Sequence, residues 1–160
     1  MKISLLLCIL CASIGFQSCK KNENEKVVNS KKIAVEKPVS VQCYKAMYEK
    51  DTIDLKMNTL KNGKITGEMV MKFFNTPKKI GKIAGEFSGD TLFASYTFIQ
   101  GNDKKITFKN PMAFLKRGEQ LILGNGKMLN TMGATYFDKS SPIDFESVKF
   151  KFSAVECVAE

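Results

Sequence analysis

The side chains of this chain that could do chemistry are mainly cysteines and carboxylates, because none of its 160 residues is histidine. The absence of an imidazole excludes Ser-His-Asp and Cys-His nucleophilic sites, an imidazole general base and nearly all metal sites that depend on histidine. The sequence also lacks the Gly-x-Ser-x-Gly elbow of many hydrolases. We therefore expect no enzyme, no catalytic residue, no cofactor and no metal.

The carboxylates form no recognisable site. Residues 39–160 contain 13 Asp and Glu, scattered over the turns. Neither the run 138–144 nor the run 51–54 has the alternating oxygen ligands and the glycine of a calcium loop. A carboxylate pair that cleaves glycosides is defined by its separation in space. An enzyme acting on polymers therefore stays open as the least favoured hypothesis.

The cysteines are more informative. Three of the five lie at or before residue 19, which leaves Cys43 near the start of the folded region and Cys157 near its end. An even pair in an oxidising compartment is typical of a disulfide. Closing a loop of this length would stabilise the fold by about 4–5 kcal/mol in the chain-entropy model. The alternative is two buried free thiols.

The elements that must position these residues are strands. From Val39 onward, short alternating runs are separated by turn signals, which is typical of an all-β sandwich or barrel. Eight strands in simple succession favour an antiparallel up-and-down barrel, with a β-sandwich as the alternative. A disulfide between the first and last strands would bridge the barrel seam. The expected strands cover residues 39–49, 52–60, 64–74, 80–87, 91–99, 104–115, 120–123 and 147–155.

Three details of the strand pattern set conditions on the fold. Pro111 requires an edge position or a bulge. The similar runs 63–69 and 81–87 place Gly67 and Gly85 on the inward face, which favours a bend or a close backbone approach, with an open ligand slot as the alternative. Cys157 lies on the opposite face from the inward phenylalanines of the last strand, so the pairing requires a bulge or an outward disulfide.

The barrel interior is the first candidate binding site. Met69, Met71 and Phe108 belong to an inward face rich in methionine and phenylalanine. An eight-stranded barrel is just wide enough to be filled by its own side chains or to hold one small ligand. A packed core is the favoured interpretation, and a cavity lined by these three residues is the alternative.

A second candidate lies in the segment 127–138, which is too apolar for a free loop. We interpret residues 127–137 as a short helix or as a plug over one mouth of the barrel. Binding groups gather on loops that a rigid scaffold holds in place. Tyr136 and Asp138 are therefore the expected ligand-binding residues of this segment.

The first residues of the chain have the organisation of a secretory signal. Lys2 is followed by an uncharged, mostly apolar run of about 14 residues, from Ile3 to Phe16, and the small residue Ser18 precedes Cys19. A membrane-spanning helix needs roughly 20 apolar residues, so a removable signal is the favoured interpretation.

The run Phe16-Gln17-Ser18-Cys19 resembles the lipobox of bacterial lipoproteins. This resemblance implies that residues 1–18 are a signal peptide and that Cys19 carries fatty acid. Phe16 and Gln17 depart from the commoner Leu and small residue, which leaves ordinary secretion with a free Cys19 as the alternative. Residues 19–38, rich in Lys, Asn, Glu and Ser, are expected to form a flexible tether to a single domain at 39–160.

With this start, tether and β domain, the chain resembles small outer-membrane lipoproteins of Gram-negative bacteria. The domain also looks like calycin-type barrels and like the barrel of copper-homeostasis and envelope-stress lipoproteins. Barrels of the latter group carry a Cys-x-x-Cys near the first strand, whereas only Cys43 stands there in this chain. The resemblance therefore implies a location in the cell envelope, anchored to the outer membrane, and implies little about metal.

The net charge and the expected compartment limit which partners this chain can have. Residues 39–160 hold 18 basic and 13 acidic residues, a surplus of five that suits a solvated surface or contact with anionic lipid or polysaccharide. An exported chain rarely meets nucleic acid, so none is expected. The favoured function is a lipid-anchored structural or interaction module with envelope proteins as partners. A carrier or sensor of a small apolar ligand is the alternative.

Overall fold

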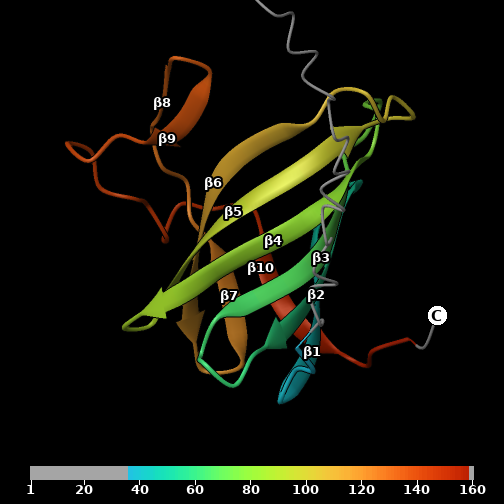
Figure 1. The fold of residues 1–160 in the computed structure, drawn as a ribbon, viewed down its shortest axis with the longest axis vertical. Helices are drawn as coiled ribbons and strands as arrows, with labels where there is room; N and C mark the ends of the chain where they lie inside the picture. The colour runs from blue at the N-terminus through green and yellow to red at the C-terminus, as the bar shows by residue number, and fades with distance from the viewer. Residues whose placement is uncertain (1–35, 159–160) are drawn as a thin grey trace, which may run out of the picture. The chain divides into compact units, whose positions relative to one another are not determined.

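The computed structural model describes residues 36–158, and all the regular structure in this part of the chain is β-strand (Figure 1). No helix long and apolar enough to cross a membrane occurs among these residues. The expected signal peptide and Cys19 lie outside them. The strands are β1 (Ser40–Tyr48), β2 (Asp51–Thr59), β3 (Ile65–Lys72), β4 (Lys79–Ser88), β5 (Thr91–Gln100), β6 (Phe108–Arg117), β7 (Gln120–Leu123), β8 (Met128–Thr131), β9 (Ala134–Phe137) and β10 (Lys151–Val155).

Eight of these strands close into an antiparallel barrel in the order β1-β10-β7-β6-β5-β4-β3-β2. This confirms the up-and-down barrel and excludes the sandwich. The strands β8 and β9 form a separate hairpin, which is inserted between β7 and β10 and contacts β6 through β9. Figure 1 shows the hairpin standing beside β6.

The expectations for the region 127–137 are wrong in two respects. The segment is a β-hairpin rather than a helix, because its turn at Met132 and Gly133 has positive φ at both residues, 52° and 79°. Two such residues make the tight turn that matches the twist of paired strands. The hairpin also lies beside β6 and is largely exposed, so it does not plug a barrel mouth.

Inward side chains pack the barrel interior. Met69 is fully buried, Met71 is nearly so, and both belong to one continuous apolar cluster. The hydroxyl of Tyr96, on β5, extends past β4 and donates to the backbone oxygen of Met69, on β3, at 3.0 Å. The core is therefore filled by its own side chains, and the buried Tyr96 hydroxyl has a hydrogen-bond partner. Its largest fully buried members are Tyr96, Phe114, Phe152, Ile53, Ile65, Met69, Ile83, Leu92 and Leu121.

The two similar runs pack against each other through their glycines. In the β3–β4 register, Gly67 lies opposite Ile83 and Gly85 lies opposite Ile65, so each glycine faces an isoleucine of the other strand. A Cβ at Gly67 would lie 3.2 Å from Cγ1 of Ile83 and would collide with the backbone oxygen of Lys56. The glycines therefore serve close approach, and Ile83 occupies the space over Gly67.

One side of the barrel, formed by β6, β7 and β10, is held by few strand pairs, and we call it the thin wall. β10 and β7 are joined by only two residue pairs, and β6 pairs with β7 only from Phe114 onward. The N–H of Gly124 donates to the carbonyl of Ala113, so Ala113 and, by strand alternation, Pro111 direct their backbone groups toward this edge. The missing N–H of Pro111 thus faces a stretch where β6 has no strand partner, which confirms the expected edge position.

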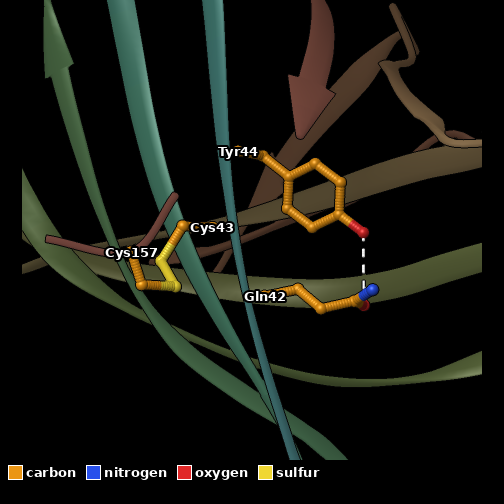
Figure 2. Close-up of a disulfide and its surroundings, with 4 residues drawn as sticks. All are labelled: Gln42, Cys43, Tyr44 and Cys157. Carbon is orange, nitrogen blue, oxygen red and sulfur yellow. Dashed lines mark hydrogen bonds between the residues drawn. A yellow bond between two sulfur atoms is a disulfide. The ribbon is translucent and has the colours of Figure 1, made fainter. Parts of the chain in front are cut away.

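The disulfide between Cys43 and Cys157 spans 114 residues of sequence and joins β1 to the segment that follows β10 (Figure 2). Cys43 is paired with Val155, the last residue of β10, and its neighbour Tyr44 points into the core. Cys43 must therefore point outward, as alternation requires. The outward disulfide resolves the conflict between the position of Cys157 and the inward face of β10.

Replacing one of these cysteines should weaken the fold strongly. The Cys157→Ala variant is expected to lose about 4–5 kcal/mol of unfolding free energy, because the unfolded chain regains the entropy of a long loop. Denaturant unfolding of the two proteins under non-reducing conditions measures this loss. Equal midpoints with intact and absent disulfide would contradict the role of the bridge in holding the seam.

The glycine packing predicts a second effect. Gly67→Ala should destabilise the domain by about 1–3 kcal/mol, because the added methyl collides with the Lys56 backbone rather than with a movable side chain. The double variant Gly67→Ala/Ile83→Val should recover little of this loss, since shortening Ile83 leaves the backbone collision in place. If denaturant unfolding showed that the double variant regains the full unfolding free energy, the Ile83 side chain, and not the Lys56 backbone, would be the reason for the glycine.

Candidate binding surface

The residues expected at an interior site do not converge. Met69 and Met71 lie in the packed core, whereas Phe108 is 43% exposed at the start of β6. Its ring stacks on Phe98 at 5.4 Å between centroids. Phe108 is on the inward face as expected but lies at the barrel end rather than in the closed core, because β6 begins at this residue and Ile106 before it is exposed outside the strand.

The two residues expected at a loop site stabilise the hairpin. The Tyr136 hydroxyl shares a hydrogen bond of 2.9 Å with the Thr131 hydroxyl across the hairpin. The Asp138 carboxylate is nearly buried and accepts from the Ser140 hydroxyl, the Ser140 N–H and the Lys127 ammonium, at 2.6, 2.9 and 3.0 Å. These donors, led by the Ser140 hydroxyl, lower the pKa of Asp138 to about 2. Asp138 thus closes the hairpin base.

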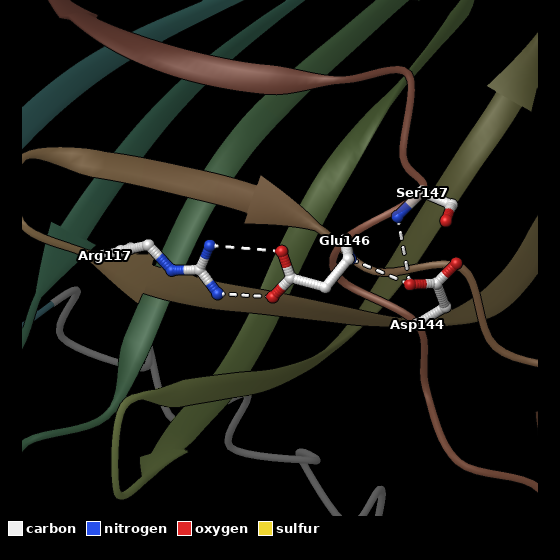
Figure 3. Close-up of polar contacts among 4 residues, drawn as sticks. All are labelled: Arg117, Asp144, Glu146 and Ser147. Atoms are coloured by element: carbon white, nitrogen blue, oxygen red, sulfur yellow. Dashed lines mark hydrogen bonds and ion pairs between the residues drawn. The ribbon is translucent and has the colours of Figure 1, made fainter.

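A second polar anchor holds the rest of the insertion against the barrel (Figure 3). Arg117, the only arginine of the chain, pairs with both carboxylate oxygens of Glu146, at 2.7 and 3.4 Å. The hydrogen bonds and opposite charges of this pair raise the pKa of Arg117 and lower that of Glu146. The Asp144 carboxylate accepts from the N–H groups of Glu146 and Ser147, at 2.8 and 3.1 Å, which fixes the turn.

The insertion also brings apolar side chains onto the thin wall. Ala113 and Ile122 are buried although they alternate with inward residues, so they lie on the outer face of the barrel under other chain segments. A Cβ at Gly124 would collide with Ile143 and Phe145 at 2.5 and 2.6 Å. The glycine therefore lets these two side chains pack directly on the backbone of the wall.

Beside this covered region, the outer wall carries a groove of about 580 Å³. Its floor is a row of small or compact outward residues, Thr66, Ala84, Ser95 and Pro111, which are register partners across β3, β4, β5 and β6. Because these side chains are short, the wall is hollow between larger neighbours. The walls include Leu60, Lys64, Glu86, Phe93 and Phe137.

A second cleft of about 410 Å³ continues the groove toward the hairpin. It lies between β6 and the hairpin residues 133–135, and it shares Ser95 and Pro111 with the first hollow. We call the two together the outer groove. Phe93, on its wall, is 45% exposed, so the groove presents apolar surface beside hydrogen-bonding groups.

Sequence reasoning missed this surface, although a signal was present. On the outward face, Thr66 and Ala84 stand at equivalent positions of the two similar runs, each between two charged residues. Pairing of Ala84 with Ser95 could not be read from the sequence, because it depends on the register of β4 and β5.

The chemistry that the outer groove offers is binding through apolar contact and hydrogen bonds. Residues 36–158 contain no group of three or more Cys, Asp or Glu side chains placed to hold a metal ion. No protein-family model, curated protein or solved structure matches the chain.

Proposed function

We propose that this chain is a lipid-anchored interaction module of the cell envelope, attached to the outer membrane through Cys19 and binding a segment of a partner envelope protein in its outer groove. The anchor and location rest on the lipobox-like residues 16–19 and the resemblance to outer-membrane lipoproteins. The observation that carries the binding role is the outer groove itself, with its floor of small side chains and its exposed apolar wall.

The packed interior supports this function over a carrier. Met69 and Met71, which a carrier would use to line its cavity, are buried against other core side chains. A guest molecule would have to displace them. Surface available for recognition is instead on the outer wall, where Phe93 and Phe137 border the groove.

The edge of β6 favours a polypeptide as the occupant. Lys109 and Pro111 border the cleft, and strand alternation directs their backbone groups away from β5. Within residues 36–158, no backbone ladder joins this part of β6 to β9. An extended segment can hydrogen-bond to such an edge while its side chains enter the groove. An apolar small molecule could not use these backbone groups.

The anchor is tested by metabolic labelling. Cells given a labelled fatty acid should label the wild-type protein and leave the Cys19→Ala variant unlabelled, because the cysteine thiol is the acyl acceptor. The variant should also leave the outer-membrane fraction. Equal labelling of both proteins would refute lipidation at this residue, whatever the groove binds.

The groove is tested by photo-crosslinking in intact cells. A photoreactive side chain at Phe93, in the groove, should give a discrete adduct with one protein, while the same probe at Val41 should not. Both positions are 45% exposed, and Val41 lies on β1 away from the groove. Adding Ala84→Arg should abolish the Phe93 adduct, because the long side chain fills the floor, and should leave the thermal unfolding temperature nearly unchanged.

Two results would contradict the groove as the binding surface. One is an identical adduct from both probe positions. The other is a Phe93 adduct that survives Ala84→Arg in a folded protein.

A further inference from the structure

The two ends of the barrel differ in charge. The up-and-down order gathers the turns 48–51, 73–79 and 100–108, together with residues 149–151, at one end, which we call the lysine mouth. These segments are rich in lysine, with Lys50, Lys78, Lys79, Lys104 and Lys105 in the turns and Lys149 and Lys151 beside them. Glu49, Asp51 and Asp103 are their acids, so positive charge is in excess at this end. The segments 36–40, 60–64, 88–91, 116–120 and 155–158 at the opposite end are nearly balanced in charge.

Aromatic rings close the lysine mouth. Phe150 stacks on Phe73 at 5.8 Å between ring centroids and meets Tyr48 edge-on at 6.2 Å. The ammonium of Lys79 lies 5.6 Å from the Phe73 ring, and that of Lys149 lies 5.1 Å from the Tyr48 ring. These distances suit cation–π attraction, so the ammonium groups of Lys79 and Lys149 are held at the rim of the mouth.

Exposed apolar side chains surround the same end. Phe74 is 56% exposed with the Lys50 ammonium 4.4 Å from its ring, and Ile106 is 55% exposed. Met132, at the hairpin tip, is fully exposed in a backbone conformation that side-chain-bearing residues rarely adopt. The tip belongs to this end, because the cleft that contains Gly133 also contains Thr107.

We propose that the lysine mouth and the hairpin tip dock onto the surface of an anionic lipid bilayer. Lysines attract anionic headgroups, while exposed aromatic and aliphatic side chains gain by entering the boundary between headgroups and acyl chains. A polysaccharide would match the charge but would not offer acyl chains to Phe74, Ile106 and Met132. The inference rests on the proposed anchoring at Cys19, which keeps the domain near the bilayer.

This docking fixes an orientation that the anchor alone does not. Strand β1 begins at Ser40, at the end opposite to the lysine mouth. The floor of the outer groove lies on the flank of the barrel, across β3 to β6. With the mouth on the lipid, this floor faces sideways and stays open to a partner, while the second cleft, which contains Thr107 and Gly133, lies near the bilayer.

The test uses the absence of tryptophan from the chain. A single tryptophan is introduced as Phe74→Trp at the mouth or as Phe93→Trp near the opposite end, where the native side chains are 56% and 45% exposed. The full-length proteins are reconstituted in vesicles of phosphatidylglycerol and phosphatidylethanolamine with brominated acyl chains. Bromine should quench the tryptophan at position 74 several-fold more than the one at position 93.

Matched lysine pairs provide the control. Lys104→Glu/Lys105→Glu at the mouth should remove most of the quenching at position 74, and Lys61→Glu/Lys64→Glu at the opposite end should leave it. All four native side chains are exposed. Brominated phosphatidylcholine alone should quench weakly, because it lacks the anionic headgroup.

Equal quenching at positions 74 and 93, or none at 74, would overturn the docking. So would an emission shift of the tryptophan at position 74 that a soluble anionic polysaccharide produces and the vesicles do not. Cosedimentation of the protein with the vesicles is measured in parallel and reports the anchor. A protein that cosediments without quenching at position 74 refutes the docking alone, whereas one that fails to cosediment refutes the proposed anchoring.

Discussion

The structure depends on the closure of the barrel between β7 and β10, where the two strands share few residue pairs. β10 meets β7 through only two residue pairs, so the sheet alone provides little to hold this seam. Two other features hold β10 in place. On its β7 side, the insertion between β7 and β10 packs on the outward side chains of the thin wall, and on its other side the Cys43–Cys157 disulfide ties the segment that follows β10 to β1. The Arg117–Glu146 pair keeps that insertion in place, although its exposure limits what it adds to stability.

These constraints separate the roles of the two faces of the sheet. On the inner face, glycines opposite isoleucines bring β3 and β4 into close contact, and the Tyr96 hydroxyl of β5 donates to the backbone of β3. The side chains of the inner face therefore stabilise the fold by packing against one another. On the outer face, the register that pairs these glycines also aligns Thr66 with Ala84, which starts the floor of the outer groove. Surface that a partner could contact therefore lies on the outer wall, on the hairpin and at the ends of the barrel.

The sequence predicted those features of the fold that depend on short segments of the chain. Alternation and turn signals identified the eight barrel strands, because each strand pattern is contained in a short segment. The even pair of cysteines in the folded region identified the disulfide, because an oxidising compartment was expected. The pattern failed at Phe108, whose inward parity is correct but whose depth depends on where β6 begins. It failed again at residues 127–137, expected as a short helix, which form a hairpin whose turn contains methionine. The outer groove depends on register across four strands, which no single strand encodes.

The central claim is that the barrel interior is filled by its own side chains, so that binding takes place outside. Native mass spectrometry of the protein purified from the envelope in mild detergent tests this most directly. We expect the mass of the acylated chain with one disulfide and no further small molecule. A stoichiometric apolar molecule that stays with the folded domain, and is released when the domain unfolds, would contradict the claim and would make the carrier the leading function.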